Sequence, residues 1–185
     1  MRVTYNAPFV LSFALISAAV LAIDSAVGTT IAKNWFTAPT HFSIWNPFDY
    51  FRLVSHVVGH ADWAHLAGNF TLILLIGPLL EEKYGSLSLL LMALTTAAVT
   101  GILNATLFST GIMGASGIVF MLIVLASCTN LKRGEIPLTF ILVILLFVVQ
   151  EAVSAFQSDN ISQFAHLAGG AAGGIFGFLL ARESD

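Results

Sequence analysis

The sequence is short of charged residues, cysteine and basic runs, and each shortage excludes a class of protein. Only 9% of the 185 residues are charged, whereas a soluble domain carries about a quarter. The one cysteine, Cys128, excludes an intrachain disulfide and suits a small apolar core position. A net charge of −3 without a basic run gives no reason to expect a nucleic-acid partner. With 57% apolar residues, the chain is predicted to form one membrane domain over residues 1–185, embedded in a lipid bilayer.

Six apolar segments are candidates for helices that cross the bilayer, a crossing that needs about 20 mostly apolar residues. These segments are approximately 8–28, 63–82, 86–108, 115–131, 136–156 and 162–181. The first also resembles a signal peptide, with Ser25–Gly28 similar to a cleavage site, but the rest of the chain favours its retention as a helix. The sequence therefore predicts an all-α membrane protein with a bundle of six transmembrane helices.

Residues 29–62 contain too many polar and proline residues to span a bilayer. They are rich in Trp, Phe and Tyr, which concentrate at the headgroup level of membranes. We therefore expect a long interfacial loop between helices 1 and 2.

The Lys and Arg residues predict the orientation of the chain, because cytoplasmic loops carry an excess of them. If both termini lie in the cytoplasm, five of the seven basic residues face inward, and Lys33 and Arg52 face outward. The inward residues are Arg2, Lys83, Lys132, Arg133 and Arg182. The interfacial loop and the candidate site described next then lie towards the outer side.

Polar side chains occur at similar depth near the outer ends of three predicted helices. Ser116 and His166 each lie 16 residues before an inner basic residue, or about 24 Å at a rise of 1.5 Å per residue. Asn69 lies 14 residues before Lys83, or about 21 Å, and His65 is one turn further out on the same face. Polar groups are costly in hydrocarbon and usually mark function, so this layer is the candidate site.

The segment Gly114–Gly117 places Ser116 between glycines at the start of a predicted helix. Such a motif is a weak signal alone, because small residues also permit close helix packing. The glycines suit a tight turn that exposes the hydroxyl group and backbone N–H groups able to stabilise an oxyanion. His166 is the candidate base that takes the serine proton. No acidic residue lies at this depth, so the sequence predicts a Ser-His dyad instead of a triad.

His65 and Asn69 are the candidate side-chain donors to an oxyanion, beside the backbone N–H of Ser116. The alternative is that they only join helices by hydrogen bonds. The last predicted helix carries small residues on one face, which let another helix approach closely and bring His166 next to the helix that begins at Ser116. These residues are Gly169, Gly173 and Gly177, with Gly170 and Gly174 beside them.

Histidine spacing also allows a metal site, because His56 and His60 are four residues apart and His65 follows. No carboxylate or cysteine completes the set and His-Glu-x-x-His is absent, so we expect neither a metal nor another cofactor. Glu81 and Glu82 are predicted to form a solvated helix end.

The chain resembles the rhomboid family of intramembrane serine proteases over essentially its whole length. The ordered motifs that carry the resemblance are Arg52, His56, His60, His65 and Asn69, Gly77-x-x-x-Glu81-x-x-x-Gly85, Gly114-Ala115-Ser116-Gly117, and Ala165-His166-x-x-Gly169-x-x-x-Gly173. The resemblance implies a six-helix bundle in a bacterial inner membrane, with Ser116 as nucleophile and His166 as general base. It also implies an oxyanion site built from His65, Asn69 and the Ser116 backbone.

Two residues depart from the family pattern. Phe51 precedes Arg52 where the family usually has Trp, which is a reason to expect looser anchoring of the outer loop. Phe120 stands where a Tyr commonly packs on the catalytic histidine; it can still stack on the imidazole, but it lacks the hydroxyl group. Neither change removes a reacting group.

The predicted function is hydrolysis of peptide bonds in or near transmembrane segments of other membrane proteins. The first alternative is a catalytically silent relative that binds membrane helices, although inactive relatives normally lack the serine or the histidine. The second alternative is a small transporter, but intramembrane carboxylates and internal repeats, which are typical of ion-coupled transporters, are not evident. The natural substrate and the oligomeric state are left open by the sequence.

Overall fold

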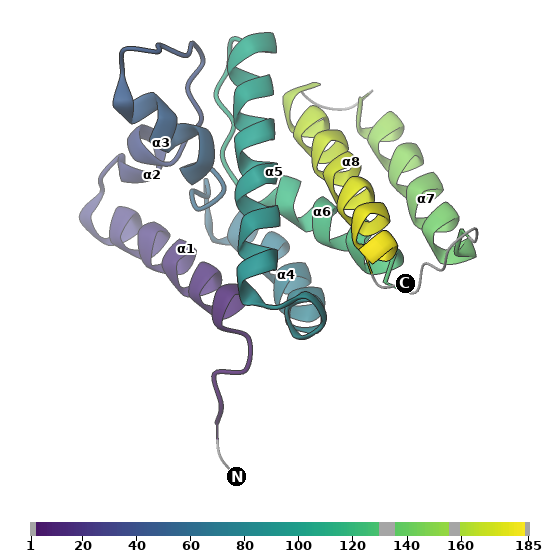
Figure 1. Ribbon diagram of the computed structural model, residues 1–185. Coiled ribbons are helices and arrows are strands. Elements are labelled where there is room, and N and C mark those ends of the chain that lie inside the picture. Colours follow the sequence, from purple (N-terminus) through teal and green to yellow (C-terminus); the bar gives the residue numbers. More distant parts are fainter. Residues whose placement is uncertain (1–2, 130–135, 156–159, 184–185) are drawn as a thin grey trace.

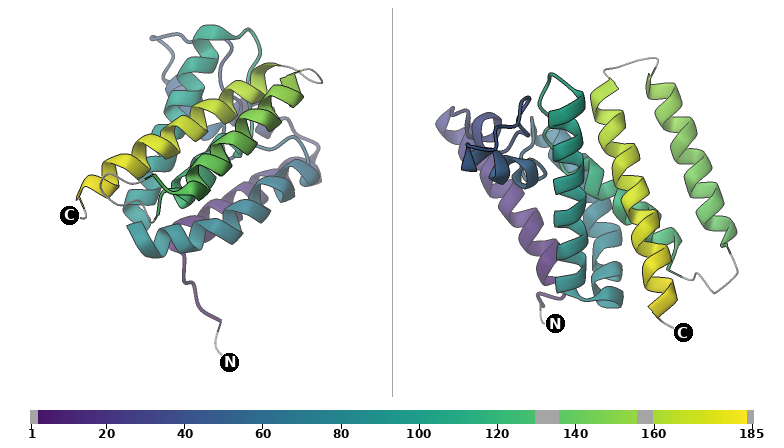
Figure 2. Two further views of the ribbon diagram at one scale, coloured as in Figure 1. Left: turned by 90° about the vertical axis from the view of Figure 1, so that its right-hand side faces the viewer. Right: turned by 45° about the horizontal axis from the view of Figure 1, so that its top comes forward.

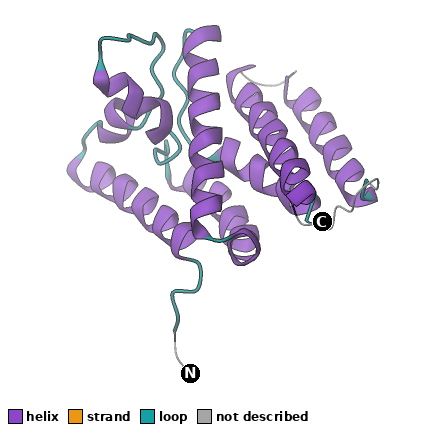
Figure 3. Ribbon diagram, in the orientation of Figure 1, coloured by secondary structure: helices purple, strands orange, loops and turns teal. Residues whose placement is uncertain are grey.

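The computed structural model describes residues 3–129, 136–155 and 160–183, and this part of the chain is all-helical, as predicted (Figure 1 and Figure 3). It contains eight helices. They are α1 (Pro8–Val27), α2 (Ile31–Trp35), α3 (Pro47–Ser55), α4 (Trp63–Tyr84), α5 (Ser86–Leu107), α6 (Ser116–Ser127), α7 (Leu138–Ala155) and α8 (Asn160–Glu183). Lys132 and Arg133, two of the residues behind the predicted orientation, lie outside the described residues, and so does Arg2.

Each of the six predicted apolar segments corresponds to one helix, but the helices differ in their ability to span a bilayer. In the described part of the chain, α1, α4 and α5 are long and apolar enough to cross. Helix α6 has only 12 residues, about 18 Å of helix against a hydrocarbon core of about 30 Å. The count of six spanning helices therefore stays a prediction.

Helix α6 occupies the centre of the bundle (Figure 1 and Figure 2). It packs against α4, α5, α7 and α8, while α1 packs against α4 and α5. Ile118, Met121, Leu122 and Leu125 on α6 are all at most 2% exposed. A helix that is apolar on every side is stable when neighbours surround it, so the composition of α6 accounts for its central place.

The segment between α1 and α4 is not the plain loop that the sequence predicts, because α2 and α3 form within it. The Asn46 side chain accepts a hydrogen bond from the Phe48 N–H at 3.1 Å, and Pro47 occupies the first helical position of α3. Both features favour helix initiation. Asp24, near the end of α1, accepts a hydrogen bond from the Ile31 N–H at 2.7 Å and so caps α2.

Glu81 corrects the prediction of a solvated helix end at Glu81–Glu82. Its side chain carboxylate accepts hydrogen bonds from the N–H groups of Phe9 at 2.7 Å and Val10 at 3.0 Å. The residue is only 4% exposed, whereas Glu82 is exposed. Helix α1 has no side-chain cap of its own, and a carboxylate at a helix N-terminus satisfies unpaired N–H groups. Glu81 therefore caps α1 from α4.

Candidate active site

The turn before α6 presents Ser116 at the first position of the helix. Gly114 has a φ of +125°, a conformation that side chains with a Cβ rarely adopt. A Cβ at Gly114 would also lie 2.7 Å from Nε2 of His65. The Gly114 N–H donates to the His56 carbonyl at 2.9 Å. The φ angle and the His65 contact thus require glycine at 114 both for the turn and for the approach of α4. Ser116 itself is half-buried.

The segment between α1 and α4 holds the loop that leads to this turn. The Ala38 N–H donates to the Ile112 carbonyl at 2.9 Å. One residue earlier, the Thr37 carbonyl accepts from Nε of Arg52 at 2.8 Å. Arg52 Nη1 also lies 3.7 Å from the buried carboxylate of Asp49. Arg52 thus connects α3 to the backbone that supports the loop before Ser116.

Helices α6 and α8 meet through glycines. A Cβ at Gly169 would collide with the carbonyl group of Gly117, and a Cβ at Gly173 would collide with that of Met121. A Cβ at Gly117 would in turn lie 3.3 Å from the Ala165 carbonyl oxygen. Gly169 and Gly173 of the glycine face predicted from the sequence therefore lie directly against the backbone of α6.

This packing brings the His166 region of α8 to the start of α6. The rings of His166 and Phe120 have centroids 4.4 Å apart and are tilted by 37°. Phe120 follows Ser116 by four residues, so the two side chains share a face of α6. Ala165, the neighbour of His166, lines the same cavity as Ser116. The structure therefore places Ser116 and His166 at one end of the α6–α8 pair.

His65 and Asn69 approach the same turn from α4. The Asp62 side chain caps α4 by accepting from the His65 N–H at 2.7 Å. A Cβ at Gly114 would lie 3.6 Å from Nδ2 of Asn69 as well as against the His65 ring. Asn69 is buried, with 8% of its surface exposed. The four predicted site residues thus come from three helices: His65 and Asn69 lie against Gly114, and His166 packs on Phe120, four residues after Ser116.

The rings of His56 and His60 have protein partners on both nitrogens. For His56, Nδ1 lies 3.1 Å from the Leu53 carbonyl and Nε2 lies 3.3 Å from the Thr100 hydroxyl. For His60, Nδ1 lies 3.1 Å from the Val58 carbonyl and Nε2 lies 3.1 Å from Nδ2 of Asn69. Burial lowers the pKa of both imidazoles to about 4.

These contacts bear on the metal alternative. Among the described residues, no group of three or more His, Cys, Asp or Glu side chains is placed to hold a metal ion.

Thr100 and the contact between His60 and Asn69 were not singled out by the sequence. The contact from Thr100 to His56 spans 44 residues, and no local spacing marks such a pair.

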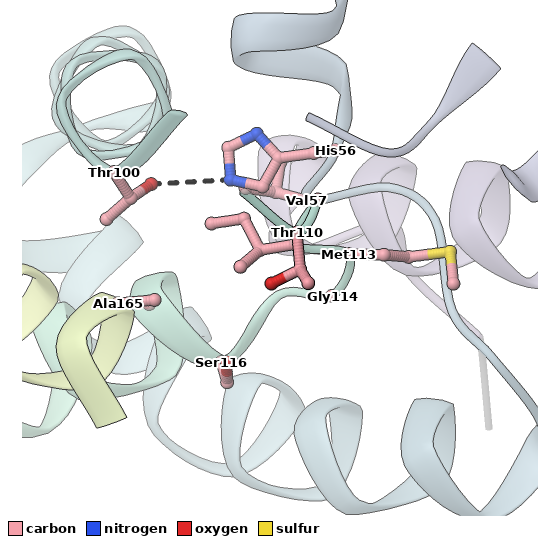
Figure 4. A pocket seen from close by; sticks show the side chains of 11 residues that line it. His56, Val57, Thr100, Thr110, Met113, Gly114, Ser116 and Ala165 are labelled. Carbon is pink, nitrogen blue, oxygen red and sulfur yellow. Dashed lines mark hydrogen bonds between the residues drawn. The ribbon is translucent and has the colours of Figure 1, made fainter. Parts of the chain in front are cut away.

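A cavity of about 250 Å³ opens beside Ser116 (Figure 4). Its lining includes His56, Thr100, Thr110, Met113 and Ala165. Figure 4 shows the hydrogen bond between His56 and Thr100 on the wall across from Ser116. The volume is ample for several water molecules, and the hydroxyl and imidazole groups offer them hydrogen-bond partners.

Comparisons with known proteins identify relatives of this chain. A family model described as Rhomboid domain matches residues 47–183. The rhomboid protease GlpG of Haemophilus influenzae is 24% identical over 131 residues, which cover 69% of this chain and 68% of that protein. The chloroplastic Rhomboid-like protein 11 of Arabidopsis thaliana is 24% identical over 149 residues, which cover 72% of this chain and 53% of that protein.

Proposed function

The chain belongs to the rhomboid family, and we propose that it is an intramembrane serine endopeptidase that cleaves transmembrane segments of other membrane proteins. The observation that carries the proposal is the glycine-mediated contact of α8 with the first two turns of α6. This contact supports the pairing of His166 with Ser116, and the approach of His65 and Asn69 to Gly114 supports an oxyanion site at the same turn.

In the proposed reaction, Oγ of Ser116 attacks the carbonyl carbon of the scissile peptide bond, and His166 accepts the hydroxyl proton. The resulting tetrahedral oxyanion accepts hydrogen bonds from the Ser116 N–H, His65 and the Asn69 amide. As the intermediate collapses, the C–N bond breaks and His166 gives its proton to the leaving amine. An acyl group then remains on Ser116.

Hydrolysis of this acyl group needs a water molecule, and the cavity next to Ser116 has room for one. His166 accepts a proton from the water as it attacks, and then returns a proton to Oγ of Ser116. The N–H groups in the first turn of α6 have no partners within the helix, and the helix dipole favours negative charge there. Both effects support an oxyanion at this position.

The remaining predicted site residues have supporting roles in this proposal. Gly114 and Gly117 allow the turn and the close approach of α8, and Phe120 packs on the imidazole of His166. Arg52 fixes the outer segment through the Thr37 carbonyl. No step of the proposed reaction uses a metal or another cofactor.

The chain is an integral membrane protein, and we infer its orientation from the arrangement of its ends. The start of α1 and the end of α8 lie at the same end of the bundle (Figure 1 and Figure 2). The segment between α1 and α4 exposes Ile44 and Trp45, which are 62% and 87% exposed, and such side chains suit the headgroup region. We propose that the chain is one membrane domain in a bacterial inner membrane, with cytoplasmic termini and the site near the outer side.

The proposed function is tested with purified protein in proteoliposomes that contain a single-span substrate. Wild type should release two fragments, and Ser116→Ala should release none. Ser127→Ala is the matched control, because Ser127 is at the other end of α6, where its hydroxyl donates to the Val124 carbonyl at 2.6 Å. A fluorophosphonate probe should label wild type and Ser127→Ala only.

Two results would overturn the assignment of a protease. Undiminished cleavage by Ser116→Ala would exclude Ser116 as the nucleophile. The second result is that wild type binds single-span substrates but cleaves none of them and is not labelled by the probe. This result would instead support a catalytically silent binder of membrane helices.

A further inference from the structure

The imidazole of His60 lies between the candidate oxyanion donor Asn69 and the backbone that precedes Ser116. His60 belongs to the turn between α3 and α4 and is only 1% exposed. Its Nδ1 is 3.1 Å from the Val58 carbonyl oxygen. A carbonyl oxygen can only accept, so Nδ1 must carry the proton and donate it. In the neutral ring, Nε2 is then a bare acceptor.

Two donors converge on this bare nitrogen. Nδ2 of Asn69 lies 3.1 Å from Nε2 of His60, and the N–H of Ala115 points to the same atom from 3.4 Å. The amide oxygen of Asn69 could not take the place of Nδ2, because two acceptors would then face each other. The neutral ring of His60 therefore selects one of the two orientations of the Asn69 amide.

The selected orientation matters because an amide nitrogen carries two hydrogens. One hydrogen of Asn69 Nδ2 is engaged by His60, and the second is left to point elsewhere. Nδ2 faces the Gly114 backbone, since a Cβ at Gly114 would lie 3.6 Å from it. With the amide turned over, Oδ1 would face this region and repel an oxyanion instead of donating to it.

We propose that His60 is a positioning residue: its Nε2 holds the Asn69 amide with a free N–H towards the oxyanion and anchors the Ala115 N–H next to Ser116. This inference rests on the proposed protease function. His60 itself touches no reacting atom, and it acts through Asn69 and through the turn that presents the nucleophile.

The surroundings of His60 favour the neutral ring that this role requires. The ring packs against Phe70, with centroids 5.6 Å apart, and against His65, with centroids 5.0 Å apart. Burial, and to a lesser degree the neighbouring His65, lower its pKa to about 4, although the hydrogen bond with the Val58 backbone and the charge of Asp62 act in the opposite direction. A protonated ring would donate from both nitrogens, reverse the Asn69 amide and leave the Ala115 N–H without its acceptor.

A double-mutant cycle on cleavage rates tests the positioning role. His60→Leu removes the acceptor, and we expect kcat to fall at least tenfold with KM little changed. In the Asn69→Ala background, the fold-reduction in kcat caused by His60→Leu should be several times smaller, because the amide that His60 orients is gone. His60→Gln, whose side-chain oxygen can accept, should restore part of kcat. His41→Leu, which changes an exposed histidine, should leave kcat unaltered.

Nuclear magnetic resonance of protein with ¹⁵N-labelled histidine provides a second test, independent of activity. At neutral pH, the His60 resonances should show a protonated Nδ1 and a bare Nε2, in wild type and in Ser116→Ala alike. A protonated Nε2, or losses in kcat from His60→Leu and Asn69→Ala that simply multiply, would overturn the proposal. If wild type cleaves no substrate, the protease function fails, and the state of Nε2 alone decides whether His60 orients the Asn69 amide.

Discussion

Adding one methyl group at Gly169 should separate the two helices that carry the proposed nucleophile and base. In Gly169→Ala, the new Cβ would lie 2.8 Å from the Gly117 carbonyl carbon and 3.0 Å from its Cα. Carbon atoms pack comfortably at about 3.5–4.0 Å, so the helices must move apart by roughly 1 Å at this point. Gly169 is three residues from His166, so the shift is passed almost directly to the imidazole.

A misplacement of about 1 Å can cost about 100-fold in rate, and we expect a loss of this size in kcat for Gly169→Ala. The assay is initial cleavage of a single-span substrate in proteoliposomes, with equal amounts of folded protein verified by size-exclusion chromatography. Two other glycines of α8 supply matched controls. A Cβ at Gly174 would make an ordinary contact of 3.8 Å with the Val124 side chain, so Gly174→Ala should retain full activity.

Gly177→Ala is a control that distinguishes the effect of lost helix packing from the effect of a displaced base. Its Cβ would lie 2.5 Å from Cβ of Cys128, which also forces the helices to shift, although the neighbour here is a side chain instead of the backbone. However, Gly177 is 11 residues, or about 16 Å of helix, from His166. We expect this variant to lose thermal stability but to keep most of its activity per folded molecule. Full activity in Gly169→Ala, or equal losses in Gly169→Ala and Gly177→Ala, would refute the reasoning.

Three further predictions concern the oxyanion site, the cap of α1 and acid stability. Asn69→Ala should lower kcat by about 10²–10³ yet leave measurable cleavage, because the Ser116 N–H is retained; an unchanged kcat would exclude Asn69 as a donor. Glu81→Gln should cost about 1.5–3 kcal/mol in the free energy of unfolding, since Phe9 and Val10 donate to different carboxylate oxygens and the NH2 group that replaces one of them cannot accept; the exposed Glu82→Gln is the control, and equal effects would contradict the cap. The folded state keeps His56 and His60 neutral down to a pKa of about 4, against 6.5 when unfolded. The unfolded chain therefore binds more protons between these values, and the free energy of unfolding should fall as pH drops from 6.5 towards 4. In equilibrium unfolding in detergent, a plot of the free energy of unfolding against pH should have a shallower slope for His60→Leu than for wild type.

The helices could be predicted from the sequence because their signals are local. Long apolar runs gave α1, α4 and α5 almost to the residue, and the Gly114–Gly117 segment gave the start of α6. The helix α3 was missed, although Asn46 and Pro47 are a recognised start signal. The aromatic composition of residues 29–62 indicates a place at the membrane interface, and it does not distinguish a short helix from a loop there.

The contacts that escaped prediction join residues distant in the sequence. Glu81 accepts from Phe9 across 72 residues, and the N–H of Ala115 reaches His60 across 55. Periodicity and spacing describe neighbours within one helix, so they cannot show which carboxylate caps another helix. They also could not show that His60 lies against Asn69, a pairing that depends on the turn between α3 and α4.

The division of the site between α6 and α8 has a consequence for biosynthesis. His166 leaves the ribosome 50 residues after Ser116, or roughly 3–10 s later at about 5–20 residues per second. During that interval the nascent chain carries the proposed nucleophile without its base. The glycine contacts that seat the base form only after α8 has entered the bilayer. In the proposed mechanism, the chain therefore stays inert while its own hydrophobic helices are being inserted, and proteolysis becomes possible only when the last helix docks.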